Sequence, residues 1–272
     1  MQRAAKYAGQ HGILLTTDAD GIVPPDWVAR NLAAMATGVD AVCGAIVVDS
    51  LEATAIPQAL HDDDFLECKL LDLLDQIAFR VDPELHDPRP RHNQASGASL
   101  AISSKAFRRV GGIPRVASGE DRALINALTH LDARIRHDTD IVVVVSGRLE
   151  GRAAGGMADT IRRRMVAQDE FCDDLVEPAA DRFRRFDFRR RSRLAWRDVP
   201  ALRSELAADL GLARQHLDRL LSAPYFGAAW ATIQAVSPVL IRRKVKFADL
   251  PRQIELAGQF LDPIGIPSAV DG

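Results

Sequence analysis

The sequence predicts an α/β fold in which a mainly parallel β-sheet is flanked by helices. Short apolar runs alternate with helical patterns up to about residue 150. The strongest strand signals are the runs at 41–48 and 141–145, and the second consists of consecutive β-branched residues. Apolar strands that alternate with helices are typical of parallel sheets covered on both faces. After about residue 155 the strand signals end and arginine-rich helical patterns follow, which predicts a helical C-terminal extension.

The first elements follow from apolar spacing and from turn residues. Residues 11–17 form a short apolar run, which predicts a buried strand. A helix is expected over 26–35, after two prolines. Leucines and an isoleucine recur at helical spacing within 56–79, so this segment predicts a long amphipathic helix. Three prolines mark residues 82–94 as a loop.

The next elements alternate in the same way. Residues 97–103 predict a strand after a turn of small residues, and 104–112 predict a short helix that ends at a glycine pair. A further helix is expected over 119–131, and one or two strands over 133–146. The extension contains two helical stretches, 200–222 and 225–236.

The bulk composition fits a soluble protein with an α/β domain at 1–165 and a helical extension at 166–272. The 272 residues are 47% hydrophobic and 26% charged, with a formal net charge of -2, which argues against a general affinity for nucleic acid. The three cysteines are far apart and odd in number, so they predict neither a disulfide framework nor a zinc site. Together with the absence of an apolar signal segment, this predicts a cytoplasmic location.

Two basic segments lie in the extension. The run at 182–193 interleaves phenylalanines with arginines, and we interpret it as an amphipathic interdomain segment with Phe183 and Phe186 inward. It matches no RNA-binding motif, so no nucleic-acid partner is expected. The apolar stretch 228–241 is short for a membrane span and predicts a core or interfacial helix. The three cations at 242–244 leave peripheral contact with the cytoplasmic face of a membrane open.

Two aspartates, Asp18 and Asp20, follow the first predicted strand. Side chains at i and i+2 of a strand point the same way, and ligands of open α/β sheets bind beyond the carboxyl ends of strands. Two adjacent carboxylates repel each other unless a cation lies between them, and Mg²⁺ or Mn²⁺ fits this requirement. The alternative is a polar Asx-turn.

A second acidic motif, Ser118 to Asp121, opens the helix predicted at 119–131. Ser118 and Asp121 have the spacing of a capping box, and acids in a first helical turn favour the helix dipole. Alternatively, Glu120 or Asp121 could act as a general base on a substrate hydroxyl. Taken alone, the motif favours the helix cap over the catalytic group.

Four stretches together resemble the family 2 glycosyltransferases of the GT-A fold, a Rossmann-like fold. They are TTDADGIVPPDWVARNLAAM, NQASGASLAISSKAFRRVGGI, SGEDRAL and VVVVSGRLEGRAAGG. Each is moderately specific, but the set follows the family's order and spacing over roughly residues 3–165. The resemblance implies an inverting, metal-dependent enzyme that transfers a sugar from a UDP- or GDP-sugar to a hydroxyl acceptor.

The resemblance also implies roles for matched residues. Asp20, with Asp18, would hold Mg²⁺ or Mn²⁺ against the donor diphosphate, and the metal would act as a Lewis acid. Asp121 would be the base that deprotonates the acceptor, and Glu120 would orient that acceptor. The following small residues would line the sugar and acceptor pocket: Ser96, Gly97 and Ala98.

Two features depart from the family pattern. Ser146 stands where relatives often carry a histidine metal ligand, so Arg148 or Arg152 is expected to bind phosphate there instead. His137, nearby in sequence, is interpreted as a structural histidine. Members also begin with a V-I-P-x-x-N-E strand and a second βα unit, for which this chain has no counterpart. On the order of 60–80 residues of the pattern are therefore missing, which predicts a truncated domain with an exposed sheet edge.

Two other functions remain open at this stage. The chain could be an inactive, truncated remnant that serves as an interaction protein and self-associates through its exposed edge. It could also be a nucleotidyltransferase on a similar sheet, which would release pyrophosphate from a nucleoside triphosphate. The acid motif at 118–121 favours the glycosyltransferase over the nucleotidyltransferase.

Overall fold

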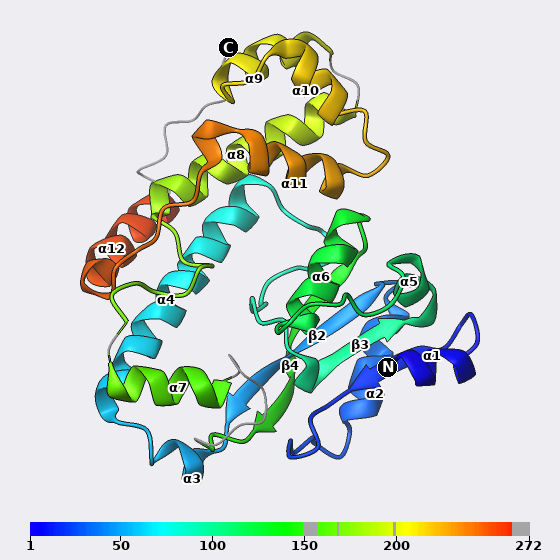
Figure 1. Ribbon diagram of the computed structural model, residues 1–272, viewed down its shortest axis with the longest axis vertical. Coiled ribbons are helices and arrows are strands. Elements are labelled where there is room, and N and C mark those ends of the chain that lie inside the picture. The colour runs from blue at the N-terminus through cyan, green and yellow to red at the C-terminus, as the bar shows by residue number, and fades with distance from the viewer. Residues whose placement is uncertain (149–156, 168, 198–199, 263–272) are drawn as a thin grey trace. The chain divides into compact units, whose positions relative to one another are not determined.

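The computed structural model describes residues 1–148, 157–167, 169–197 and 200–262. The chain divides into two compact units (Figure 1). The first, the sheet unit, contains residues 1–57 and 84–168, and the second, the helical unit, contains 58–83 and the chain from 169 onward.

The sheet unit has an α/β fold, as predicted, with four strands in the order β1-β3-β2-β4. The strands are β1 (Ile13–Thr16), β2 (Ala41–Val48), β3 (Leu100–Ser103) and β4 (Ile135–Val145). β2 and β4 pair in parallel, whereas β3 is antiparallel to both β1 and β2. The sheet is therefore mixed, and the expectation of a mainly parallel sheet was wrong.

The loop before β3 explains the reversal of that strand. Gln94 accepts a hydrogen bond from the backbone N–H of Ile46 (2.7 Å) and donates one to its carbonyl (3.3 Å). His92 Nε2 donates to the Cys43 carbonyl (3.1 Å) while its Nδ1 accepts from the Gln94 N–H. The chain thus follows the carboxyl half of β2, reaches the end where β2 stops, and must run back along it.

β4 is a single long strand, although the sequence allowed one or two. Its pairing with β2 is regular up to Gly44 and Asp138, then shifts so that Ala45 faces Val142. A Cβ on Gly44 would lie 2.2 Å from Ser99 Oγ and 2.7 Å from the Ile141 carbonyl. Glycine is therefore required at this irregularity, where three segments meet closely.

Alternate strand residues serve two cores, one on each face of the sheet. Cys43 and Ile102 point to a core shared with α1 (Gln2–Tyr7), α5 (Ser104–Arg109) and α6 (Glu120–His130). Val42 and Ala101 point to the opposite core, which α2 (Trp27–Ala36) covers with Trp27 and Met35. The sheet unit therefore has a layer of helices on each face. Two further helices of this unit are α3 (Ser50–Ala53) and α7 (Met157–Val166).

The helical unit is built around α4 (Gln58–Val81). Its buried residues Leu70, Leu74 and Ile77 share a core with α12 (Leu250–Leu261) and with the start of α8 (Ala179–Trp196). The end of α8 packs in a second core with three shorter helices: α9 (Arg203–Asp209), α10 (Arg214–Leu220) and α11 (Phe226–Val236). The sequence assigned α4 to the first domain, but it clusters with this unit.

The arginine-rich run forms α8, and its arginines pair with carboxylates of the helical unit. Arg193 pairs with Asp82 at 3.2 Å, and Arg185 pairs with Glu177 at 2.9 Å. Phe183 stacks on Phe260 with 5.3 Å between ring centroids. The run is thus an integral part of a packed core rather than a solvated basic tract.

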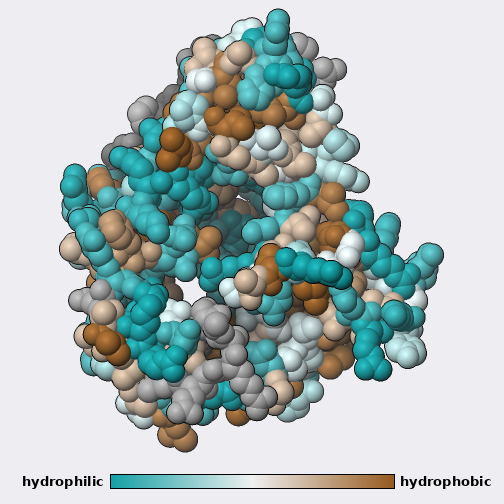
Figure 2. Space-filling view, viewed as in Figure 1, coloured by the Kyte–Doolittle hydropathy of each residue, from teal (hydrophilic) through white to brown (hydrophobic). Residues whose placement is uncertain are grey.

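Two features of the structure concern contact with a membrane: the length and apolarity of its helices, and the distribution of hydrophobic side chains on its surface. Among the helices of the described ranges, none has the length and apolarity needed to cross a membrane. On the face seen in Figure 2, hydrophilic side chains predominate and hydrophobic ones lie in small separate groups.

Candidate active site

The turn after β1 places the aspartate pair beside the end of β4. The Gly21 N–H donates to the Asp18 carbonyl (3.1 Å) and closes the turn. Ile22 and Val144 then exchange two backbone hydrogen bonds, of 2.8 and 3.0 Å. Asp18 and Asp20 are both exposed on this turn. They lie at the strand ends, where the sequence placed a ligand site.

The electrostatics of Asp18 show which acids lie near it. The pKa of Asp18 is above its ordinary value, because the surrounding protein partly desolvates the carboxylate and because Asp20 and Asp121 carry like charge. Arg148 opposes this rise, and Glu120 adds to it. Four side chains that the sequence selected from three separate segments thus lie within electrostatic range of Asp18, and two of the five, Arg148 and Asp20, are in direct contact. We refer to these five residues as the acidic cluster.

Asp121 is held by the turn before β3 and not by a helix cap. The N-cap residue of α6 is Gly119, with φ 73°, and no side chain caps this helix. The capping box expected between Ser118 and Asp121 is therefore absent. Instead, Asp121 Oδ2 accepts the Gly97 N–H (2.9 Å) and Oδ1 accepts the Arg122 N–H (2.7 Å).

The three small residues expected to line a pocket differ in position. Ser96 Oγ caps the short 3-10 helix η1 (Gly97–Ser99) by accepting the Ala98 N–H (3.2 Å). Gly97 contacts Asp121 through its backbone, as described above. Ala98 lies in the core on the α2 side of the sheet and is 1% exposed. The Ala98 side chain therefore packs in the core beneath the turn and is not available to line a ligand pocket.

A fixed segment follows β4 and carries Arg148. Glu52 Oε2, from α3, accepts hydrogen bonds from Ser146 Oγ (2.7 Å) and from the Gly147 N–H (2.5 Å). Arg148 then pairs with Asp20, with 2.5 Å between Nη1 and Oδ2. The sequence did not single out Glu52. Asp49 caps α3 in a recognisable way, but no sequence pattern indicates that the next acid reaches the end of β4. Arg152, the other predicted phosphate ligand, lies outside the described residues.

The aspartate pair fits a divalent cation that keeps part of its water shell. Among the described residues, no group of three or more His, Cys, Asp or Glu side chains is arranged to enclose a metal ion. Mg²⁺ commonly uses only one or two carboxylates and completes its shell with water and phosphate oxygens, and Mn²⁺ accepts the same ligands. Desolvation first, and then the like charges of Asp20 and Asp121, raise the pKa of Asp18, and Arg148 offsets only part of this rise; a bound cation would lower the pKa further.

A second charged cluster, around His137, anchors the loop before β3. His137 Nδ1 donates to Asp87 Oδ2 (2.8 Å), and Asp87 also pairs with Arg91 (3.1 Å) and Arg136 (3.2 Å). Burial alone would lower the pKa of His137, but the hydrogen bond and charge of Asp87, helped by the Cys43 side chain, raise it to about 10. Burial, and then the charge of His137, lower the pKa of His92 to about 4.

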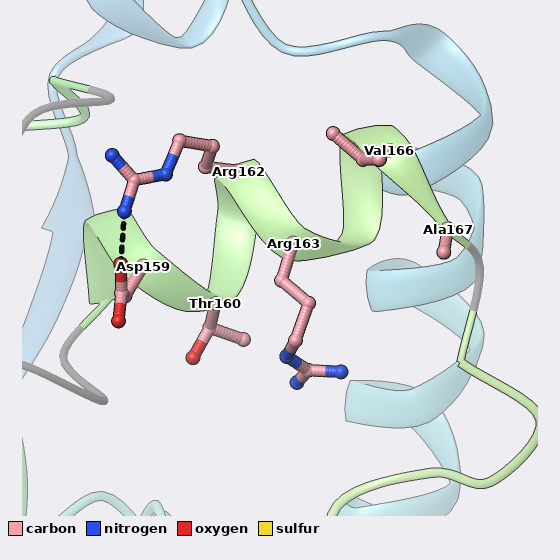
Figure 3. A pocket seen from close by; sticks show the side chains of 6 residues that line it. All are labelled: Asp159, Thr160, Arg162, Arg163, Val166 and Ala167. Atoms are coloured by element: carbon pink, nitrogen blue, oxygen red, sulfur yellow. Dashed lines mark hydrogen bonds and ion pairs between the residues drawn. The ribbon is translucent and has the colours of Figure 1, made fainter.

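The structure also has a shallow pocket on α7 that contains none of the predicted site residues (Figure 3). It is lined by Asp159, Thr160, Arg162, Arg163, Val166 and Ala167. Asp159 pairs with Arg162 along the helix surface. Because its described lining comes only from α7 and the residue that follows it, this pocket carries no candidate site.

The fold and the acidic cluster define an α/β protein with carboxylates and one guanidinium gathered at the ends of two strands. No protein-family model matches the chain, and neither a curated protein nor a solved structure matches it significantly. The side chains of the acidic cluster are therefore the basis for assigning a function.

Proposed function

We propose that the chain is an inverting, metal-dependent glycosyltransferase domain of the GT-A type, which uses a UDP- or GDP-sugar. The observation that carries this proposal is the acidic cluster. Aspartates after β1, an acid at the start of α6 and an arginine after β4 affect one another electrostatically, although they are far apart in sequence. Metal binding, phosphate binding and proton abstraction are the three tasks that such a transfer requires.

Asp18 and Asp20 would hold Mg²⁺ or Mn²⁺ through their carboxylate oxygens. When bound, the metal neutralises charge on the leaving nucleotide diphosphate. Arg148 would contact the same phosphates, and its ion pair with Asp20 supports this role. These three side chains would therefore bind and orient the donor.

Asp121 would remove the proton from the acceptor hydroxyl. The hydroxyl oxygen attacks the anomeric carbon as the bond from that carbon to the diphosphate oxygen breaks, so the configuration inverts. The proton passes to the Asp121 carboxylate, and the electron pair leaves with the diphosphate. The hydrogen bonds from Gly97 and Arg122 fix the orientation of this carboxylate before substrate binds.

The test is thermal unfolding with UDP, GDP and ADP, each with and without Mn²⁺. A ligand at 100 times its dissociation constant adds about 2.7 kcal/mol to the free energy of unfolding. We expect one nucleotide to stabilise the chain only when Mn²⁺ is present, and Asp20→Asn to abolish the effect. Asp26→Asn is the matched control, since Asp26 is also an exposed aspartate paired with an arginine at 2.7 Å.

The alternatives give different results. Stabilisation by nucleoside triphosphates, with release of pyrophosphate, would identify a nucleotidyltransferase. If no nucleotide stabilises the chain with or without metal, the glycosyltransferase proposal for this chain is rejected in favour of a non-catalytic role.

A further inference from the structure

The ion pair between Arg148 and Asp20 occupies the carboxylate to which the proposed metal would bind. The acidic cluster holds four carboxylates and this one guanidinium (Asp18, Asp20, Glu120, Asp121 and Arg148). A guanidinium stays protonated at any physiological pH, so it is a permanent counter-ion. Arg148 and a divalent cation therefore compete for Asp20.

The backbone just before Arg148 is held by hydrogen bonds, whereas the Arg148 side chain is half exposed and, among the described residues, is held only by its ion pair with Asp20. Glu52 holds Ser146 and Gly147 through two hydrogen bonds. A Cβ on Gly147 would lie 2.5 Å from Val48 Cγ1, so the backbone at this residue packs closely against β2. The Arg148 side chain is 50% exposed. The Arg148 guanidinium can therefore leave Asp20 by a change of side-chain rotamer, without a shift of Ser146 or Gly147.

We propose that Arg148 is a tethered counter-ion that holds Asp20 in the ligand-free protein and is drawn away by a diphosphate, with Glu52 as the residue that positions it. This inference rests on the proposed function, because it assumes that Asp20 binds a divalent cation. Arginine binds carboxylate and phosphate oxygens alike through paired hydrogen bonds, but a diphosphate offers it more oxygens and more negative charge than the single Asp20 carboxylate does. A diphosphate that takes Arg148 frees Asp20 for the metal.

The consequence is positive cooperativity between metal and diphosphate. Each ligand removes an obstacle to the other, and the coupling free energy is the same in both directions. The metal alone should bind weakly, because it must first displace Arg148. The site is thereby kept from filling with metal when no donor is present.

The test measures Mn²⁺ binding to the whole chain by the loss of the free-ion electron paramagnetic resonance signal. Arg148→Gln should bind Mn²⁺ alone on the order of tenfold more tightly than the wild type. Arg30→Gln is the matched control, because Arg30 is 47% exposed and pairs with Asp26 at 2.7 Å in the same unit, and it should leave Mn²⁺ binding unchanged. Asp20→Asn should abolish binding in both backgrounds.

Glu52→Ala distinguishes positioning from a simple change in local charge. Removing a negative charge near a cation site weakens cation binding if only the field matters. Loss of the residue that positions Arg148 should instead strengthen Mn²⁺ binding, and this gain should vanish when Arg148 is already glutamine. Loss of local charge predicts weaker Mn²⁺ binding and loss of positioning predicts stronger binding, so the direction of the change in Glu52→Ala decides between them.

Inorganic pyrophosphate, added as its preformed Mn²⁺ complex, tests whether Arg148 binds the diphosphate. The complex should stabilise the wild type against heat more than it stabilises Arg148→Gln. Equal Mn²⁺ binding by the wild type and Arg148→Gln, with binding lost in Asp20→Asn, would overturn the counter-ion role and leave the metal site standing. If neither the wild type nor Arg148→Gln binds Mn²⁺, the metal site of the proposed function fails.

Discussion

The hydrogen-bond partners of Asp121 bear on its role. Its carboxylate accepts the Gly97 N–H from the turn before β3 as well as the Arg122 N–H of its own helix, and it forms no capping box with Ser118. Asparagine at this position can still accept that hydrogen bond through its amide oxygen, but it cannot take a proton from a hydroxyl.

We therefore expect Asp121→Asn to lower sugar transfer by about 10²- to 10⁴-fold and to leave nucleotide-dependent thermal stabilisation intact. The assay follows release of the nucleotide diphosphate from the donor whose nucleotide stabilises the chain. Ser118→Ala is the control, because Ser118 makes no cap in α6 and should not alter the rate. Full activity in Asp121→Asn would remove this residue from the base role.

The His137 cluster makes stability depend on pH. The pKa of His137 is raised to about 10, so its contribution is complete below about 6.5 and is lost as the pH rises towards 10. The pKa of His92 is lowered to about 4, so stability is also lost as the pH falls from about 6.5 to 4.

Stability should thus be greatest near pH 6.5, which urea unfolding between pH 5 and 9 can establish. For His137 the slope above this maximum cannot exceed about 1.4 kcal/mol per pH unit. The variant His137→Gln removes the titrating group and should show a flatter curve on the alkaline side. Identical slopes for both proteins would show that His137 does not carry the dependence.

At the residue scale the sequence predicted side-chain types better than contacts. Motifs selected the five residues of the acidic cluster, and four of them affect the pKa of the fifth, Asp18, while Arg148 contacts Asp20. Glu52 was missed, because its role depends on a contact between α3 and the end of β4 that no local pattern encodes.

At the scale of the elements, the direction of β3 is set by the loop that precedes it. An apolar run of strand length predicts a strand but carries no information about its direction. Here the direction depends on Gln94, which bonds to both backbone groups of Ile46. The sequence therefore predicted the strands and the helices between them, but not the mixed sheet.

Replacing Gln94 should weaken the sheet unit. Gln94→Ala leaves the N–H and the carbonyl of Ile46 without their side-chain partner, which should cost about 1–3 kcal/mol in urea unfolding. Gln94→Glu keeps an acceptor for the N–H but loses the donor to the carbonyl, so its loss should be smaller. Equal stability of the alanine variant and the wild type would mean that this loop does not hold β3 in place.

At the scale of the whole molecule, the chain leaves the sheet unit after residue 57 and returns at 84. The sequence predicted that α4 has one apolar face, but an amphipathic pattern does not say which partner covers that face. The partners are in α8 and α12, roughly 100 or more residues later in the chain. For this reason the sequence alone placed α4 with the strands, whereas in the structure it clusters with the helical unit.

A fragment of residues 1–168 tests this arrangement. It keeps the sheet unit but leaves Leu70, Leu74 and Ile77 without their core, and each such side chain is worth about 1.5–3 kcal/mol when buried. We expect the fragment to self-associate, as measured by size exclusion with light scattering. The same fragment with these three residues changed to glutamine should be monomeric. A monomeric unmodified fragment would show that α4 does not need the helical unit.

Because α4 precedes α8 and α12 in the chain by a long stretch, the ribosome synthesises it well before its partners. During synthesis α4 emerges roughly 100 residues before α8, which at about 5–20 residues per second is an interval of about 5–20 s. Over that interval the nascent chain presents a 24-residue helix whose apolar stripe has nothing to cover it. A ribosome-associated chaperone would find its binding surface there. The sheet unit must meanwhile pair β1 and β2, which precede α4, with β3 and β4, which follow it, while α4 itself still lacks its partners.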